Sequence, residues 1–263
     1  MLAQERYSII LQSANTEGII KVSELKEQLN VSQETIRRDL NYLEQCGKVQ
    51  KIFGGAKLLS NSSLTNPTSD IPYTGFNERK KENAAEKNLI AKCAASLISE
   101  GQSVAMDSGT TVVSLAHILK KQFKQLTVVT NSLNVVDALS NATDFTTILT
   151  GGIYRADDRV LVSDISSHIF DQLSINICFL TALGVSLEKG VTYQRVDEVY
   201  IQRRMMQCSE QTILLVDSSK LGKNSLIRMC KLQDITAIIT DRGVSPDIVK
   251  EFENVGVKII IAE

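Results

Sequence analysis

The sequence contains no tryptophan, three prolines, two histidines and five scattered cysteines in 263 residues. The cysteines never form a Cys-x-x-Cys pair, which argues against a disulfide framework or a zinc site and indicates a reducing compartment. His117 and His168 have no metal-ligand spacing, so no metal or other cofactor is expected. No apolar run is long enough to cross a bilayer, and the first residues lack a signal-peptide layout. We therefore expect a cytoplasmic protein without a membrane partner.

The charge is almost balanced, with a net value of −1. This argues against a basic surface over the whole chain, but a local basic face remains compatible with nucleic-acid binding. The length suits two domains. Residues 58–75 are rich in Ser, Thr and Asn and contain Pro67 and Pro72, a composition typical of a linker. We predict a first domain at 1–57, a linker at 58–75 and a second domain at 76–263.

The first domain shows three helical patterns followed by a short alternating run. Ser23 is the expected N-cap of the second helix, and Ser32 is the expected N-cap of a third helix that runs to Gly47. The run "KVQKIFGGAK" is broken by Gly54-Gly55 and predicts a β-hairpin.

Two adjacent arginines lie in the third helix. At about 100° per residue, Ile36, Leu40 and Leu43 share one face, and the arginines point elsewhere. A chance pair on a solvated face is the alternative, but the order of elements favours a winged helix-turn-helix, whose second helix enters the major groove of DNA. Glutamine suits adenine, arginine suits guanine or phosphate, and the hairpin would lie along the backbone. The predicted DNA-binding residues are Ser32, Gln33, Thr35, Arg37, Arg38, Lys48, Lys51, Gly54 and Gly55.

The second domain alternates short apolar runs with helical patterns such as 86–101 and 114–123. This alternation predicts an α/β fold with a mostly parallel, Rossmann-like sheet covered on both faces. The expected strands are 103–107, 126–130, 146–151, 177–183, 212–217, 237–240 and 257–262.

Small and polar residues follow several of these strands. Ligands of open parallel sheets bind outside the carboxyl ends of the strands, and "DSGTT" at a helix start suits a phosphate. Each motif alone is a common turn or helix cap, but together they favour one anionic pocket. Asp107 would repel a phosphate, so it is expected to bind a sugar hydroxyl or a backbone amide. The candidate effector-binding residues at these ends are Asp107, Ser108, Gly109, Thr110, Thr111, Thr130, Asn131, Ser132, Gly151, Gly152, Arg155 and Lys220.

The stretch "VSELKEQLNVSQETIRRDLNYLEQCGKVQKIFGGA" resembles the DeoR family of bacterial transcriptional regulators. The likeness continues through "MDSGTT", "VVTNSL", "LTGGIYR", "VDSSKLGKNSL" and "IITD". It implies a winged helix-turn-helix joined to a sugar-phosphate-sensing domain, similar in fold to ribose-phosphate isomerases and CoA transferases. It also implies a repressor of a carbohydrate operon that leaves its operator DNA when a phosphorylated sugar binds. Since one helix-turn-helix has a small footprint, we expect a dimer or tetramer.

The chain departs from the family in two places. Many relatives carry Gly-Ala-Asp-Gly where this chain has Leu183 in place of the acid, which counts against the alternative of a sugar-phosphate isomerase with an accessory winged helix. "QRVDEVYIQRRMM" resembles the galactitol and glucitol repressors, with Asp197 in place of asparagine. In this chain Glu198, a further candidate effector-binding residue, and Tyr200 are expected either to bind effector hydroxyls, such as those of a hexitol phosphate, or to lie on the surface at a helix start. An activator, or a regulator that needs its ligand as co-repressor, also stays open.

Overall fold

The computed structural model describes residues 6–7, 9–10, 13, 19–29, 31–45, 49–52, 54–58, 74–163 and 168–263. The chain divides into two compact units, Met1–Thr65 and Asn66–Glu263, with their boundary inside the predicted linker. Each unit is described by itself. Within the described ranges, no helix is long and apolar enough to cross a membrane.

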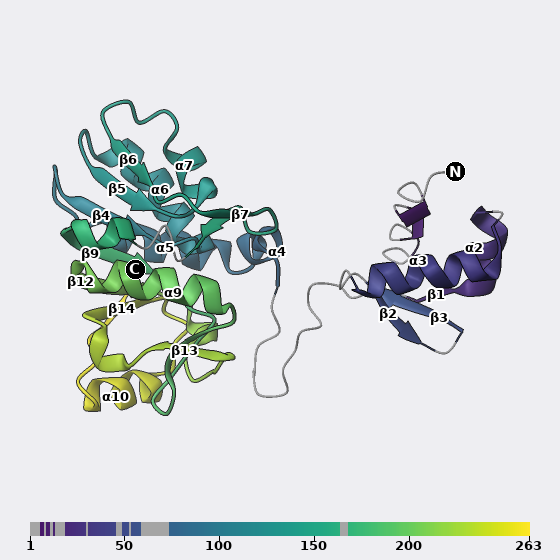
Figure 1. The fold of residues 1–263 in the computed structure, drawn as a ribbon. Coiled ribbons are helices and arrows are strands. Elements are labelled where there is room, and N and C mark those ends of the chain that lie inside the picture. Colours follow the sequence, from purple (N-terminus) through teal and green to yellow (C-terminus); the bar gives the residue numbers. More distant parts are fainter. Residues whose placement is uncertain are drawn as a thin grey trace. The chain divides into compact units, whose positions relative to one another are not determined.

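The first unit contains a helix pair and a small antiparallel sheet (Figure 1). The predicted hairpin is confirmed, and a third strand that the sequence did not reveal pairs with it in the order β1-β3-β2. Ile36, Leu40 and Leu43 form the core face as expected, together with Leu25 and Leu29. The elements are β1 (Ile19–Lys21), α2 (Val22–Leu29), α3 (Gln33–Gln45), β2 (Val49–Ile52) and β3 (Gly55–Leu58).

The helix starts agree with the sequence in one case and differ in the other. Ser32 caps α3, because its Oγ accepts a hydrogen bond from Thr35 N at 3.1 Å. The prediction for Ser23 is wrong, because α2 begins one residue earlier. The backbone N–H of Val22 donates to Gly54 O at 3.0 Å, so the hairpin turn satisfies one of the N–H donors at the start of α2.

The second unit is built on a seven-stranded sheet in the order β15-β14-β12-β9-β4-β5-β6 (Figure 1). Every neighbouring pair in it is parallel. All seven predicted strands therefore occur, and the fold class is confirmed. The strands are β4 (Ser103–Met106), β5 (Thr127–Thr130), β6 (Thr146–Leu149), β9 (Ile175–Leu180), β12 (Ser209–Leu215), β14 (Ala237–Thr240) and β15 (Ile259–Ile261).

Successive residues of each strand enter two different cores. Val104 and Met106 pack under the helices of one face, and Ala105 packs under those of the other. The first face is covered by α4 (Phe76–Lys81), α5 (Ala84–Ala95), α6 (Thr110–Gln122) and α7 (Leu133–Leu139). The second is covered by α9 (Val196–Gln207), α10 (Pro246–Asn254) and a sheet of β10 (Gly184–Ser186), β11 (Gly190–Tyr193) and β13 (Ile227–Cys230).

Short elements complete the second unit. A hairpin, β7 (Ile153–Arg155) and β8 (Val160–Val162), follows β6. Three 3-10 turns are η1 (His168–Gln172), η2 (Ser218–Lys220) and η3 (Leu232–Asp234). The helical pattern predicted at 86–101 ends early, at Ala95, because the Ser96 hydroxyl donates to Cys93 O at 2.7 Å and the chain turns there.

Candidate functional sites

The start of α3 presents polar side chains to solvent. Gln33, Arg37 and Arg38 are exposed. Arg38 Nε lies 3.6 Å from Glu34 Oε1. Both side chains are exposed, and an exposed ion pair contributes little to the free energy of folding. Within the described residues, no hydrogen bond or ion pair engages the side chains of Gln33 and Arg37. These three side chains are therefore available to a ligand that approaches the helix.

Four other predicted DNA-binding residues are needed for the structure of the first unit itself. The hydroxyls of Ser32 and Thr35 are 2.8 Å apart and belong to the start of α3. Gly54 has a φ of +82° in the hairpin turn, and a Cβ on Gly55 would lie 2.1 Å from Ile20 O. Both glycines are therefore needed by the backbone, whatever they contact.

Lys48 lies outside the described residues, and the side chain of Lys51 does too. For all nine residues, the contact with DNA stays a prediction.

An ion pair that the sequence did not suggest holds α3. Arg6 Nε and Nη2 donate to the two carboxylate oxygens of Asp39 at 2.7 and 2.9 Å. The Asp39 side chain is buried. The rings of Tyr7, which follows Arg6 in the sequence, and Tyr42, from the same helix as Asp39, stack with their centroids 4.8 Å apart. Two-point pairing of this kind fixes orientation as well as distance. Arg6 and Tyr7 thus fix the position of α3 through their contacts with Asp39 and Tyr42.

A small pocket of about 30 Å³ lies at the carboxyl ends of β4, β9 and β12, which are neighbours in the sheet. The start of α6 contributes Gly109, Thr110 and Thr111, and Lys220 follows β12. The structure therefore brings together four residues that the sequence placed at the ends of two separate strands. The amino terminus of α6 gives this pocket backbone N–H groups and a positive dipole end.

Two cations in the pocket wall were missed. Arg79 comes from α4 and Lys87 from α5. Lys87 is buried, its Nζ donates to the carbonyls of Arg79 and Glu82, and burial lowers the pKa of its ammonium group. Arg79 Nη2 donates to Asp158 Oδ1 at 3.0 Å. With Lys220, three cations surround the start of α6, and the carboxylates of Glu82 and Asp217 line the same pocket. The cations outnumber the carboxylates, which suits an anion.

The sequence did hold one signal for Lys87. It shares the buried face of α5 with Ile90, Ala91 and Ala94. A lysine on the apolar face of an amphipathic helix is unusual, since lysine is almost never fully buried unless paired.

Gly109 is required by close packing rather than by a turn. Its φ is −69°, which any residue adopts, but a Cβ would lie 2.1 Å from Thr181 Oγ1. A tight turn is therefore not the reason for this glycine. Asp107 lies just before it, and its Oδ2 accepts hydrogen bonds from Thr181 N at 3.1 Å, Thr181 Oγ1 at 2.8 Å and Gln202 Nε2 at 3.1 Å. Of the two partners expected for Asp107, the backbone amide is the one found.

Glu198 lies behind the "DSGTT" loop. It is 2% exposed, so the surface alternative is wrong for this residue. Its Oε2 accepts hydrogen bonds from Ser108 Oγ at 3.1 Å and Tyr193 OH at 3.2 Å. Burial raises the pKa of Glu198 to about 7, although Arg155 Nη1 lies 3.6 Å from Oε1. Glu198 thus supports the loop from behind and does not line the pocket.

The remaining strand-end motifs lie farther along the same edge, after β5 and β6. Thr130 Oγ1 donates to Met106 O at 2.7 Å, and Asn131 Nδ2 donates to Leu161 O at 3.2 Å. Gly151 and Gly152 have φ values of +75° and +115°, as a turn requires. Asn131 Oδ1 and Ser132 Oγ are buried without a hydrogen-bond partner in the described structure. None of these residues lines the pocket, and their contact with an effector stays a prediction.

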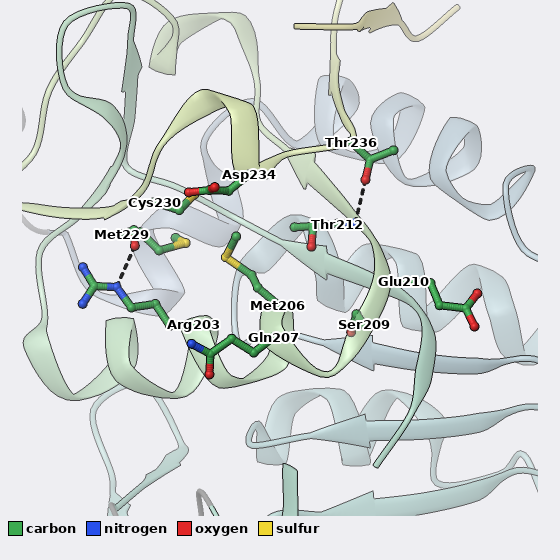
Figure 2. A pocket seen from close by; sticks show the side chains of 10 residues that line it. All are labelled: Arg203, Met206, Gln207, Ser209, Glu210, Thr212, Met229, Cys230, Asp234 and Thr236. Atoms are coloured by element: carbon green, nitrogen blue, oxygen red, sulfur yellow. Dashed lines mark hydrogen bonds between the residues drawn. The ribbon is translucent and has the colours of Figure 1, made fainter. Parts of the chain in front are cut away.

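A second cavity, of about 460 Å³, lies at the amino end of β12, between α9 and β13 (Figure 2). Arg203 Nε donates across it to Met229 O at 2.7 Å, and Thr212 N donates to Thr236 Oγ1 at 3.0 Å. No predicted effector residue lines it. It lies at the opposite strand ends from those where parallel sheets bind ligands.

Comparison with known proteins shows to which family the chain belongs. The DeoR-like helix-turn-helix domain matches residues 6–62, and the DeoR C terminal sensor domain matches residues 82–242. The chain belongs to the DeoR family. It is 32% identical over 263 residues to the HTH-type transcriptional regulator GolR of Listeria innocua, covering 100% of both chains.

Other relatives of this DeoR-family chain carry functional names. The L-fucose operon activator of Haemophilus influenzae is 34% identical over 94% of this chain and 96% of its own. The lactose phosphotransferase system repressor of Staphylococcus epidermidis is 33% identical over 91% and 92%. Among solved structures, ribose 5-phosphate isomerase A of Methanocaldococcus jannaschii matches 53% of this chain and 55% of its own with a TM-score of 0.39 and 16% identity.

Proposed function

We propose that this DeoR-family protein is a sequence-specific DNA-binding repressor of a carbohydrate-utilisation operon, released from its operator by a phosphorylated sugar or sugar alcohol. The observation that carries the effector half is the pocket at the start of α6, where Arg79, Lys87 and Lys220 gather around backbone N–H groups. Named relatives that act on the L-fucose operon and the lactose phosphotransferase system support the carbohydrate assignment.

The DNA-binding half rests on α3. Gln33 is free to meet base edges, and Arg37 and Arg38 can reach bases or phosphates. Each chain has one such helix, so an operator-binding assembly needs at least two copies. Two recognition helices would then lie about 34–36 Å apart, or a multiple of this. A symmetric dimer or tetramer follows from this proposal.

The effector's phosphate would bind at Thr110 and Thr111, with Lys220 beside it. Its hydroxyls would extend toward the end of β5, where Asn131 Oδ1 and Ser132 Oγ are buried and lack partners in the described structure. A buried polar atom without a partner costs free energy, and a hydroxylated ligand would remove that cost. A sugar or hexitol phosphate has both kinds of group.

Release from DNA requires that the effector bind one conformation better than the other. The shift in operator affinity cannot exceed that difference in effector affinity. The same rule allows a co-repressor or an activator, and one of the named relatives is an activator. The sign of regulation is therefore part of what the binding experiment measures.

We do not propose catalysis for this pocket. Leu183 occupies the position of the family acid and lines the wall. The oxygen Asp107 Oδ2 already accepts three hydrogen bonds, and Asp217 accepts from Asn83 Nδ2 at 3.0 Å and Ser219 N at 3.2 Å. These carboxylates hold the loops in place. We propose a cytoplasmic sensor rather than an isomerase.

Calorimetric titration tests the effector site. The full-length protein is titrated with sugar phosphates, hexitol phosphates and the corresponding free sugars. We expect binding of one class of ester and none of its unphosphorylated form. Lys220→Gln should weaken that binding at least about tenfold, the loss of one charged hydrogen bond, whereas Lys250→Gln on α10 should leave it unchanged. Equal binding of ester and free sugar would rule out the phosphate site.

A further inference from the structure

A groove of about 530 Å³ runs between α5 and α6, apart from the effector pocket. Lys92, His117 and Lys121 are exposed along it. Its other lining residues are Asn88, Ser114, Ile118 and Gln122. The groove therefore has two ammonium groups, several hydrogen-bonding side chains and no carboxylate in its wall.

The charge of the second unit is unevenly distributed around this groove. Residues 76–125 hold eight Lys/Arg and five Asp/Glu, whereas residues 126–263 hold thirteen and seventeen. Arg79 and Lys87 face the effector pocket, which leaves six lysines. In the described structure no carboxylate lies within ion-pair distance of any of the six, which are Lys80, Lys81, Lys92, Lys120, Lys121 and Lys124.

His117 reports the positive potential of this surface. Partial burial lowers the pKa of its imidazole, and Lys120, Lys80 and Lys121 lower it further. No carboxylate acts on it in the opposite direction. Positive charges from α4 and α6 therefore act together on one side chain in the groove.

We propose that the α5–α6 groove binds the phosphate backbone of DNA, so that the sensor unit adds sequence-independent contacts to those made by α3. Phosphates are contacted most by lysine, arginine and neutral hydrogen-bond donors, and the groove offers lysine, serine, asparagine and glutamine. A DNA-binding regulator has a polyanionic partner by its nature. The proposal goes beyond the function proposed above, in which only the winged unit touches DNA.

The test is the salt dependence of DNA binding by the full-length protein. Lys92→Gln/Lys121→Gln is compared with the wild type on a duplex that extends well beyond the protected operator, over roughly 50–200 mM KCl. Each lost phosphate contact lowers the slope of log affinity against log salt by about 0.9, so the double variant should lower it by about 2 for each subunit whose groove meets the DNA and weaken binding at least on the order of tenfold. The matched control, Lys250→Gln/Lys258→Gln, removes two exposed lysines elsewhere and should change neither.

Three outcomes would overturn the proposal. An unchanged slope in the groove variant means that DNA does not contact the groove. A lower oligomeric state of the groove variant in sedimentation, whatever its slope, means that the groove holds a second copy of the chain. An unchanged slope with weaker effector binding means that it holds a small anion. Arg38→Ala should lower the slope in every case, so failure of the groove is distinguishable from failure of DNA recognition by α3.

Discussion

Glu198→Gln should change how stability depends on pH. Glu198 is buried, and its pKa is raised from 4.5 to about 7, first by burial and then by the carboxylates of Asp158 and Asp107, while Arg155 and Arg79 act in the opposite direction. Between these two pH values the folded protein holds a proton that the unfolded chain has lost. The free energy of unfolding therefore falls as pH rises through this window. At about 1.4 kcal/mol per pKa unit, the loss is on the order of 3 kcal/mol.

Glutamine keeps the shape of the side chain and can still accept from Ser108 and Tyr193, but it does not ionise. Urea denaturation followed by circular dichroism, at about pH 5 and about pH 8, measures the effect. The wild type should lose on the order of 3 kcal/mol more than Glu198→Gln between these conditions. Glu210→Gln, at an exposed site on β12, is the control and should behave as the wild type.

An identical pH dependence in wild type and variant would refute the reasoning. Glu198 would then be ionised in the folded protein throughout the window. Its ion pairs with Arg155 and Arg195, at 3.6 and 3.9 Å, would outweigh the cost of burial. A salt-bridge network, rather than neutral hydrogen bonds, would then support the "DSGTT" loop.

Three further predictions concern single side chains. Ser32→Ala removes the cap of α3 and should cost the winged unit about 1 kcal/mol, measured by urea denaturation; an unchanged midpoint would show that the cap is not needed. Arg38→Ala should weaken operator binding and lower the salt slope by about 1 for each bound subunit, whereas Gln33→Ala should alter base preference in a binding-site selection; unchanged values would mean that α3 is not the recognition helix. Gly109→Ala must displace the start of α6 from Thr181. It should raise the effector concentration needed for release from DNA but leave the DNA affinity without effector unchanged. Gly75→Ala is the control, because a Cβ at that position meets nothing within 4 Å.

The strands could be predicted because they are buried on both sides and read as short apolar runs. β1 was missed because only Ile19–Lys21 form it, and its partner β3 comes much later in the sequence. Part of the pocket could be predicted from the small and hydroxyl residues at strand ends. Arg79 could not, because only the packing of α4 turns its charge toward the start of α6. Lys87 could be recognised as a lysine on an apolar helix face, but its place in this pocket depends on the packing of α5.

Burial also separates side chains that the sequence treats alike. Glu198 and Tyr200 lie two positions apart at the start of one helix. Glu198 faces Ser108 and Tyr193 in the interior, and Tyr200 is 41% exposed. The sequence could not tell which of them is buried, because that depends on where α9 packs against the sheet.

The most direct test of the central claim is fluorescence anisotropy of the purified protein on DNA from upstream of its own gene and the neighbouring operon. Salt is held fixed, and a panel of sugar and hexitol phosphates is added. We expect tight binding that one phosphate ester releases and its unphosphorylated sugar does not. Specific binding that no ester changes would contradict the sensor assignment, and the absence of specific binding would contradict the account as a whole.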